Sequence, residues 1–168
     1  MKKLSANGMK VLKIFHLLFI MMWVIGVVAM AIIYFAHPKS GDELYSSFHI
    51  MRLVDDILVI PGAMLTVVVA IIYGTFTNWG FFKHKWITVK WIISVTVIIV
   101  GTFIFSPWLD NCLEIANQQR DVALTDPNIL YYTPRIAIFA SIQSLALIFL
   151  IIISVFKPWK KKKQASKS

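Results

Sequence analysis

The chain has 168 residues, 58% of them hydrophobic, and a formal net charge of +9. Soluble domains are about 45–50% apolar, so this composition excludes an ordinary soluble domain and indicates a membrane protein. The lysines and arginines lie beside the apolar stretches, so their charge indicates membrane orientation, and nucleic acid is not expected as a partner.

Four apolar stretches are each long enough to cross a bilayer, because a hydrocarbon core of about 30 Å needs about 20 helical residues. The sequence therefore predicts one all-α domain over residues 1–168, an integral membrane, antiparallel four-helix bundle. We expect the spans at about 11–35, 53–76, 86–106 and 134–156, followed by a basic tail at 157–168.

Basic residues gather at both chain ends and in the connection between the second and third spans. They include Lys2, Lys3, Lys10, Lys13, Lys83, Lys85, Lys157, Lys160, Lys161, Lys162 and Lys163. Because cytoplasmic loops carry the excess of lysine and arginine, we predict that both termini are cytoplasmic. The basic tail is expected to anchor this topology, with anionic lipid head groups as its alternative partner.

The first span contains a histidine about one turn inside its cytoplasmic edge. Trp23 lies seven residues after His16 on nearly the same helix face, and Gly26 follows one turn later. An imidazole, an indole and a glycine gap on one stripe are typical of a pocket for a flat apolar ligand, and neutral imidazole is a common iron ligand. The alternative is an interfacial His16 that hydrogen-bonds to a neighbouring group.

The second span carries charged residues on its outer turns. Arg52, Asp55 and Asp56 lie there, and Arg135 begins the fourth span on the same side of the membrane. We predict a polar cluster of these four residues in which Asp55 or Asp56 pairs with Arg135. The cluster either pins two helix ends or admits a proton or cation. Pro61 predicts a kink within the second span.

The third span contains a lysine at nearly the depth of His16, because both helices run outward from the cytoplasm. Lys90 either extends its ammonium to the head groups or pairs with the carboxylate of a ligand, such as a porphyrin propionate. Cys112 is the only cysteine, which excludes an intramolecular disulfide. It is expected to be a buried packing residue, with a link between two protomers as the alternative.

The fourth helix is expected to start at Thr133 and Pro134, since a capping hydroxyl followed by proline at the first helical position is a typical helix start.

Four segments carry a resemblance to known membrane families. The first span, with His16, Trp23 and Gly26, resembles the first helix of the four-helix bacterial protoporphyrinogen oxidase family, and it is similar to the first span of the copper-resistance D family. The segments 85–90 and 156–159 resemble the third-helix start and the closing motif of the oxidase family. Asp55 and Asp56, followed by 61–63, look most like an uncharacterised bacterial four-helix integral membrane protein family.

These resemblances imply a multi-pass protein of the bacterial cytoplasmic (inner) membrane. They also imply a haem b or porphyrin site with His16 as the axial iron ligand and Lys90 beside the porphyrin. Residues 92–105 hold no histidine, although the oxidase family tends to carry one there, so porphyrinogen oxidation is not implied.

We therefore expect an integral membrane protein that binds haem b or a porphyrin in a redox role near the cytoplasmic leaflet. His16 would ligate the iron, Lys90 would hold a propionate, and Trp23 and Trp91 would pack on the ring. One alternative is a non-enzymatic membrane subunit or scaffold, and the other is a transporter of a metal ion or small solute. Enzymatic activity, and a homo-oligomer or another membrane protein as partner, stay open.

Overall fold

The computed structural model describes residues 4–77, 80–120 and 122–159. This part of the chain is helical without a strand, and it contains four helices that are long and apolar enough to cross a membrane. They cover Ala6–Tyr34, Gly41–Phe76, Lys85–Gln118 and Pro127–Phe156. The predicted all-α chain with four candidate spans is confirmed. The lysine run at 160–163 lies outside the described residues.

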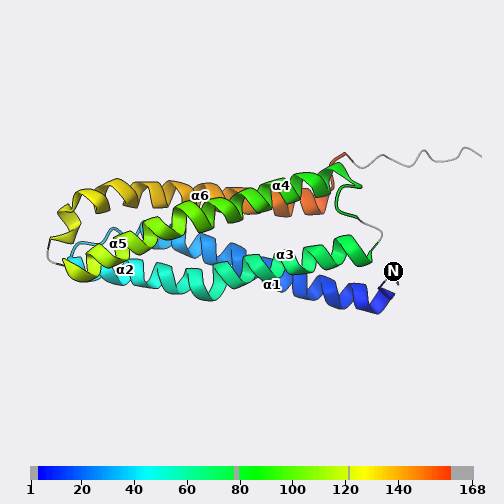
Figure 1. The fold of residues 1–168 in the computed structure, drawn as a ribbon, viewed down its shortest axis with the longest axis horizontal. Coiled ribbons are helices and arrows are strands. Elements are labelled where there is room, and N and C mark those ends of the chain that lie inside the picture. The colour runs from blue at the N-terminus through cyan, green and yellow to red at the C-terminus, as the bar shows by residue number, and fades with distance from the viewer. Residues whose placement is uncertain (1–3, 78–79, 121, 160–168) are drawn as a thin grey trace, which may run out of the picture.

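The first and last long helices are α1 (Ala6–Tyr34) and α6 (Pro127–Phe156), while the two middle ones are composite. The second consists of α2 (Gly41–Val54), η1 (Asp55–Val59) and α3 (Ile60–Phe76). The third consists of α4 (Lys85–Val100), η2 (Gly101–Phe105) and α5 (Ser106–Gln118), and a short η3 (Ala123–Thr125) precedes α6. Figure 1 shows consecutive long helices running in opposite directions, with the N-terminus and the end of α6 at the same end.

Both middle helices contain a π-helical turn that ends two residues before a proline. The backbone bonds that close these turns join Ile60 to Asp55 and Ser106 to Gly101. Proline has no N–H, and its ring clashes with the carbonyl four residues earlier. The wider π turn moves that carbonyl away, which lets the helices continue past Pro61 and Pro107.

The last helix begins earlier than the sequence predicts. The Asp126 carboxylate accepts hydrogen bonds from two following backbone amides at 2.8 and 3.3 Å, and Pro127 occupies the first turn. Pro134 lies inside the helix, where the Thr133 hydroxyl donates to the Ile129 carbonyl at 2.6 Å. The predicted start at Thr133 and Pro134 is wrong, because an equivalent cap-and-proline pair lies seven residues upstream.

Asp126→Ala is expected to lower the free energy of unfolding by about 1 kcal/mol, because the first turn of α6 loses its acceptor. Thr133→Val is the matched control. It is expected to change stability less, since the Thr133 hydroxyl only adds a bond to a carbonyl within the helix. Thermal unfolding of both variants in detergent measures the difference. A larger loss of stability for Thr133→Val than for Asp126→Ala would instead support a helix start at Thr133.

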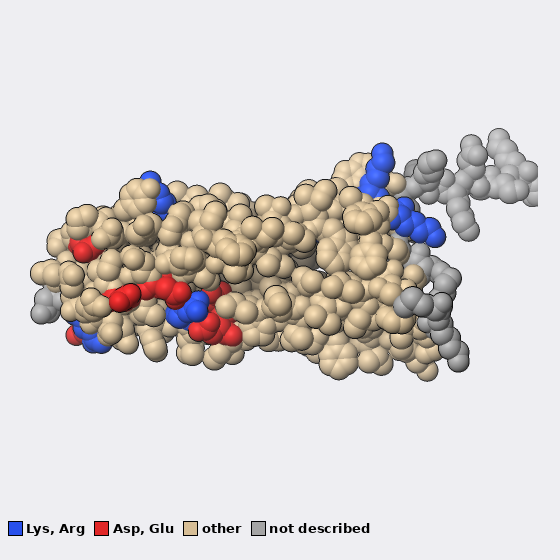
Figure 2. All heavy atoms as spheres, in the orientation of Figure 1, with Lys and Arg blue, Asp and Glu red and all other residues tan. Residues whose placement is uncertain are grey.

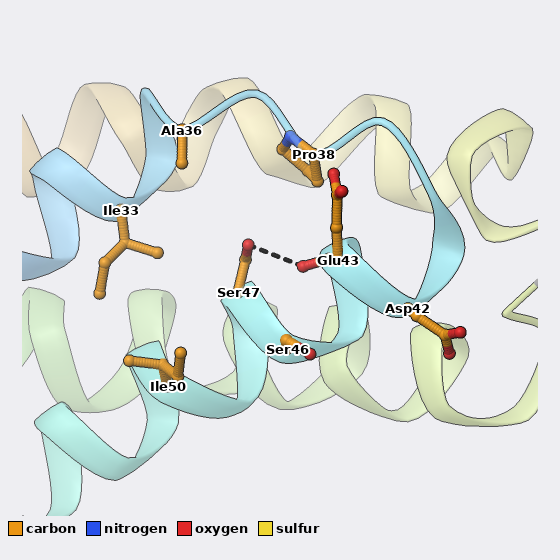
Figure 3. A pocket seen from close by; sticks show the side chains of 8 residues that line it. All are labelled: Ile33, Ala36, Pro38, Asp42, Glu43, Ser46, Ser47 and Ile50. Atoms are coloured by element: carbon orange, nitrogen blue, oxygen red, sulfur yellow. Dashed lines mark hydrogen bonds between the residues drawn. The ribbon is translucent and has the colours of Figure 1, made fainter.

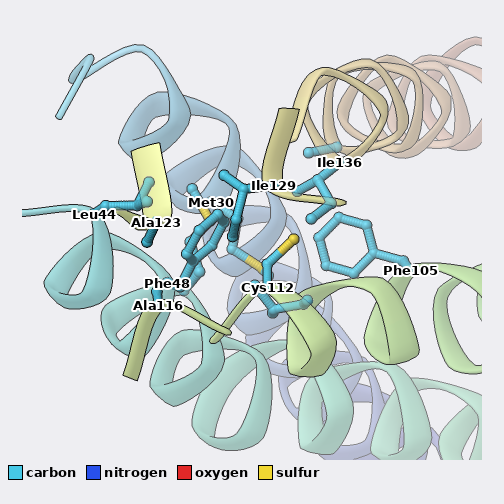
Figure 4. Packing of buried hydrophobic residues seen from close by; sticks show 12 residues of the cluster. Met30, Leu44, Phe48, Phe105, Cys112, Ala116, Ala123, Ile129 and Ile136 are labelled. Carbon is cyan, nitrogen blue, oxygen red and sulfur yellow. The ribbon is translucent and has the colours of Figure 1, made fainter. Parts of the chain in front are cut away.

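A continuous apolar core fills the end of the molecule that holds α2 and α5. We name this end the outer half and the opposite end, with α3 and α4, the inner half. Phe48, Leu109 and Cys112 are almost completely buried in it. Figure 4 shows Phe48 and Cys112 among residues of all four long helices. The predicted packing role of Cys112 agrees with this position, because its thiol has no exposed surface from which to reach a second protomer.

Glycines set the close approach of the first two long helices. A Cβ at Gly62 would lie 2.7 Å from the backbone nitrogen of Trp23, and a Cβ at Gly26 would lie 2.6 Å from the side chain of Val59. Small residues at such contacts allow helix backbones to approach closely in membranes. The first long helix therefore packs tightly against η1 and α3.

Candidate functional site

The His16 side chain is half-buried at the inner end of α1, opposite the last turns of α3. Its ring meets the ring of Tyr73 edge to face, with 5.6 Å between the centroids. The Nδ1 atom is buried and has no hydrogen-bond partner among the described residues. A buried polar atom without a partner is costly, so this nitrogen is a candidate ligand atom.

Lys90, from α4, lies near enough to His16 for its charge to act on the imidazole. Its side chain is half-buried, and its ammonium lies 5.9 Å from the centre of the Trp86 ring. The two residues that the sequence placed at one depth are therefore within electrostatic range of each other.

The other three residues predicted to bind the cofactor lie apart from this pair. Trp23 is only 3% exposed and packs in the central core with Val27 and Ala63. Gly26 is closed off by Val59 of η1. Trp91 packs on Phe81, with 5.8 Å between the ring centroids, and lines a groove between α3 and α4.

Thr66 of α3 is a polar residue that the sequence reasoning missed. It is 9% exposed, and its hydroxyl has no hydrogen-bond partner in the described part of the chain. Other threonines in the helices donate to the carbonyl four residues earlier, as Thr75 and Thr96 do at 2.9 Å. Thr66 lies on α3 between Gly62 and Tyr73. Gly62 meets α1 at Trp23, and Tyr73 meets His16. A hydroxyl within an apolar run was the only signal for it in the sequence.

By chemistry alone, an imidazole nitrogen without a partner would suit a porphyrin iron, and an ammonium nearby would suit a propionate. Trp23 and Gly26 do not fit the role of a wall for the ring, because protein side chains already occupy the space beside them. Within the described residues, no group of three or more His, Cys, Asp or Glu side chains is placed to hold a bare metal ion.

A second polar site lies on the outer half, around Arg52. Its guanidinium contacts the carboxylates of Asp55 at 3.2 Å, Asp56 at 3.3 Å and Asp110 at 3.1 Å. We call these four residues the Arg52 cluster. Figure 2 shows a basic group surrounded by acidic ones on an otherwise largely uncharged face.

Asp55 is the buried member of the Arg52 cluster. Its side chain is 6% exposed, whereas those of Asp56 and Asp110 are 50% and 52% exposed. The Ser106 hydroxyl also donates to Asp55 at 3.2 Å. Since Asp55 begins η1 and Ser106 follows η2, this bond joins the two π turns.

The predicted pairing of Asp55 or Asp56 with Arg135 is wrong. The Arg135 guanidinium lies 3.5 Å from the centre of the Tyr131 ring and donates to the Tyr131 carbonyl at 2.6 Å. Because α2 packs against α5, Asp110 of α5 takes the place that the prediction gave to Arg135. The sequence signal for Asp110 was its position three residues after Pro107, because the helix continues past that proline.

A hollow of about 550 Å³ lies at the outer end between α1 and α2, and Figure 3 shows its lining. Glu43 accepts a hydrogen bond from the Lys39 amide at 2.7 Å, and the Ser47 hydroxyl donates to the Glu43 carbonyl at 2.8 Å. These polar groups are engaged within the turn, so we do not assign a ligand to the hollow.

No family model, curated protein or solved structure matches this chain. The resemblances drawn from short motifs therefore stay predictions. The candidate functional residues are therefore His16 with Lys90, and the Arg52 cluster.

Proposed function

We propose that this chain is a multi-pass protein of the bacterial cytoplasmic membrane that binds haem b or a related porphyrin in a redox role. In this proposal the four long helices form an antiparallel bundle with both termini in the cytoplasm. Lysines at 10, 13, 83 and 85 support the orientation, because cytoplasmic segments carry the excess of positive charge. His16 and Lys90 then face the cytoplasmic leaflet.

One observation carries the proposal: the buried Nδ1 of His16 has no partner among the described residues. In a membrane helix an ionisable residue costs free energy, and such residues mark functional positions. An imidazole packed only for its shape would be expected to donate or accept through both nitrogens. A porphyrin iron would use the free nitrogen.

The neighbours of His16 have separate parts in this proposal. The Tyr73 ring edge limits the orientations of the imidazole, and the Lys90 charge favours an anionic group beside it. A bound haem would supply one-electron transfer. The chain would supply an imidazole nitrogen for the iron and a cation for a propionate.

The experiment is a visible spectrum of the protein purified in detergent from cells supplied with haem. We expect a Soret band that His16→Ala abolishes, and we expect Lys90→Met to weaken haem binding about tenfold, which corresponds to about 1.4 kcal/mol. His49→Ala is the matched control, because His49 is exposed on α2 and stacks on Tyr45 at the other end of the molecule.

A colourless preparation would overturn the proposal, as would an equal loss of the Soret band in the His16 and His49 variants. Either result would favour the membrane subunit or the transporter.

A further inference from the structure

The inner halves of α3 and α4 form the walls of an open apolar groove of about 520 Å³. Ile71 lines it from α3, Phe81 and Phe82 from the connection, and Ile92 and Val95 from α4. The groove lies beside the basic connection that leads from α3 into α4.

The groove is open because these two consecutive helices pack elsewhere. On the inner half, α3 packs on α1, and α4 packs on α6. Within the described residues α3 and α4 have no extensive contact with each other, whereas α2 and α5 close the outer half. The bundle is therefore closed at one end and laterally open at the other.

Aromatic packing fixes the inner wall of the groove. Phe81 covers Gly74, where an added Cβ would lie 2.5 Å from its ring, and the other side of Phe81 meets Trp91. Phe82 is 76% exposed beside them. Tryptophan and phenylalanine at this depth give a rigid apolar surface near the head groups.

The mouth of the groove is basic. Lys83 follows Phe82 directly, and Lys85 lies seven residues before Ile92, which places it two turns away on the same face of α4. Both side chains are exposed. The acidic residues of the described chain lie on α2, η1, α5 and the outer connections, so none neutralises this mouth.

We propose that the groove binds an anionic phospholipid of the cytoplasmic leaflet, with an acyl chain along Ile71, Ile92 and Val95 and the phosphate at Lys83 and Lys85. The inference rests on the membrane orientation in the proposed function and is independent of haem. An apolar slot beneath two cations matches the shape and the charge of this lipid.

The test uses a variant in which Trp91 is the only tryptophan and every other one is replaced by phenylalanine. The protein is reconstituted into vesicles that contain brominated phosphatidylglycerol or brominated phosphatidylcholine, which quench nearby indoles. We expect Trp91 to report about fivefold preference for phosphatidylglycerol. The double variant Lys83→Ala, Lys85→Ala is expected to remove that preference.

The double variant Lys10→Ala, Lys13→Ala is the matched control. It removes the same charge on the same side of the membrane, but from α1, away from the groove. It is expected to keep the preference. Equal quenching by both lipids in the parent protein, or equal loss in both double variants, would overturn the lipid site. The Soret band of the Lys83, Lys85 variant separates this failure from that of the haem proposal, because the band depends on His16.

Discussion

Arg52→Leu is expected to lower the free energy of unfolding by about 3 kcal/mol, because it leaves the buried Asp55 carboxylate without its counter-ion. The cost arises from an uncompensated charge in a low-dielectric environment. Unfolding in mixtures of detergent and SDS, followed by circular dichroism, measures it. The Arg52 cluster is thus expected to be the most sensitive polar site in the outer half.

A second substitution shows which carboxylate causes the loss. Arg52→Leu with Asp55→Leu is expected to recover most of the stability, since the buried carboxylate that Arg52→Leu leaves unpaired is then removed as well. Arg52→Leu with Asp56→Leu is the matched control and is expected to recover little, because Asp56 is half exposed and already solvated. Equal recovery in the two double variants would contradict the central position of Asp55.

Gly62→Ala is expected to destabilise the protein by about 2 kcal/mol. A Cβ there would lie 2.7 Å from the Trp23 backbone nitrogen, so the first two long helices would have to separate. Overpacking of this kind costs about 3 kcal/mol, and alanine returns about 1 kcal/mol through its helix propensity. The same unfolding assay measures the net effect.

Gly101→Ala is the control for Gly62→Ala. Its Cβ would meet only the Gln143 side-chain nitrogen, at an ordinary 3.4 Å, so the stability is expected to change by less than about 1 kcal/mol. A Gly62 variant as stable as the Gly101 variant would show that the helices tolerate a wider separation.

The number and approximate limits of the spans were predictable from composition, because each apolar stretch has the length that a bilayer requires. The helix ends were less accessible. Asp126 with Pro127 and Thr133 with Pro134 are both acceptable starts, and the choice depends on packing beyond the local sequence. The π turns were not predicted either, although Pro61 did indicate a local change in the second long helix.

The candidate sites were likewise predictable from the sequence only in part. The depth of His16 and Lys90 follows from counting helical turns, and in the structure the Lys90 charge is near enough to act on the imidazole. The neighbours of Gly26 depend on which helix packs against it, and a single sequence does not show that. For the same reason Arg135 was assigned to the Arg52 cluster in place of Asp110.

The two π turns have a consequence for how the middle helices are compared with other sequences. Each such turn holds one residue more than the regular spiral, and one residue corresponds to about 100° of rotation. Helix faces that are counted from the sequence at a constant angle per residue therefore shift by one residue between the side chains before Asp55 and those after Val59. The same shift occurs across 101–105. Deleting one residue within such a turn would restore a regular α-helix and leave the segments on either side in their orientation, so alignment gaps in related chains belong at these two places.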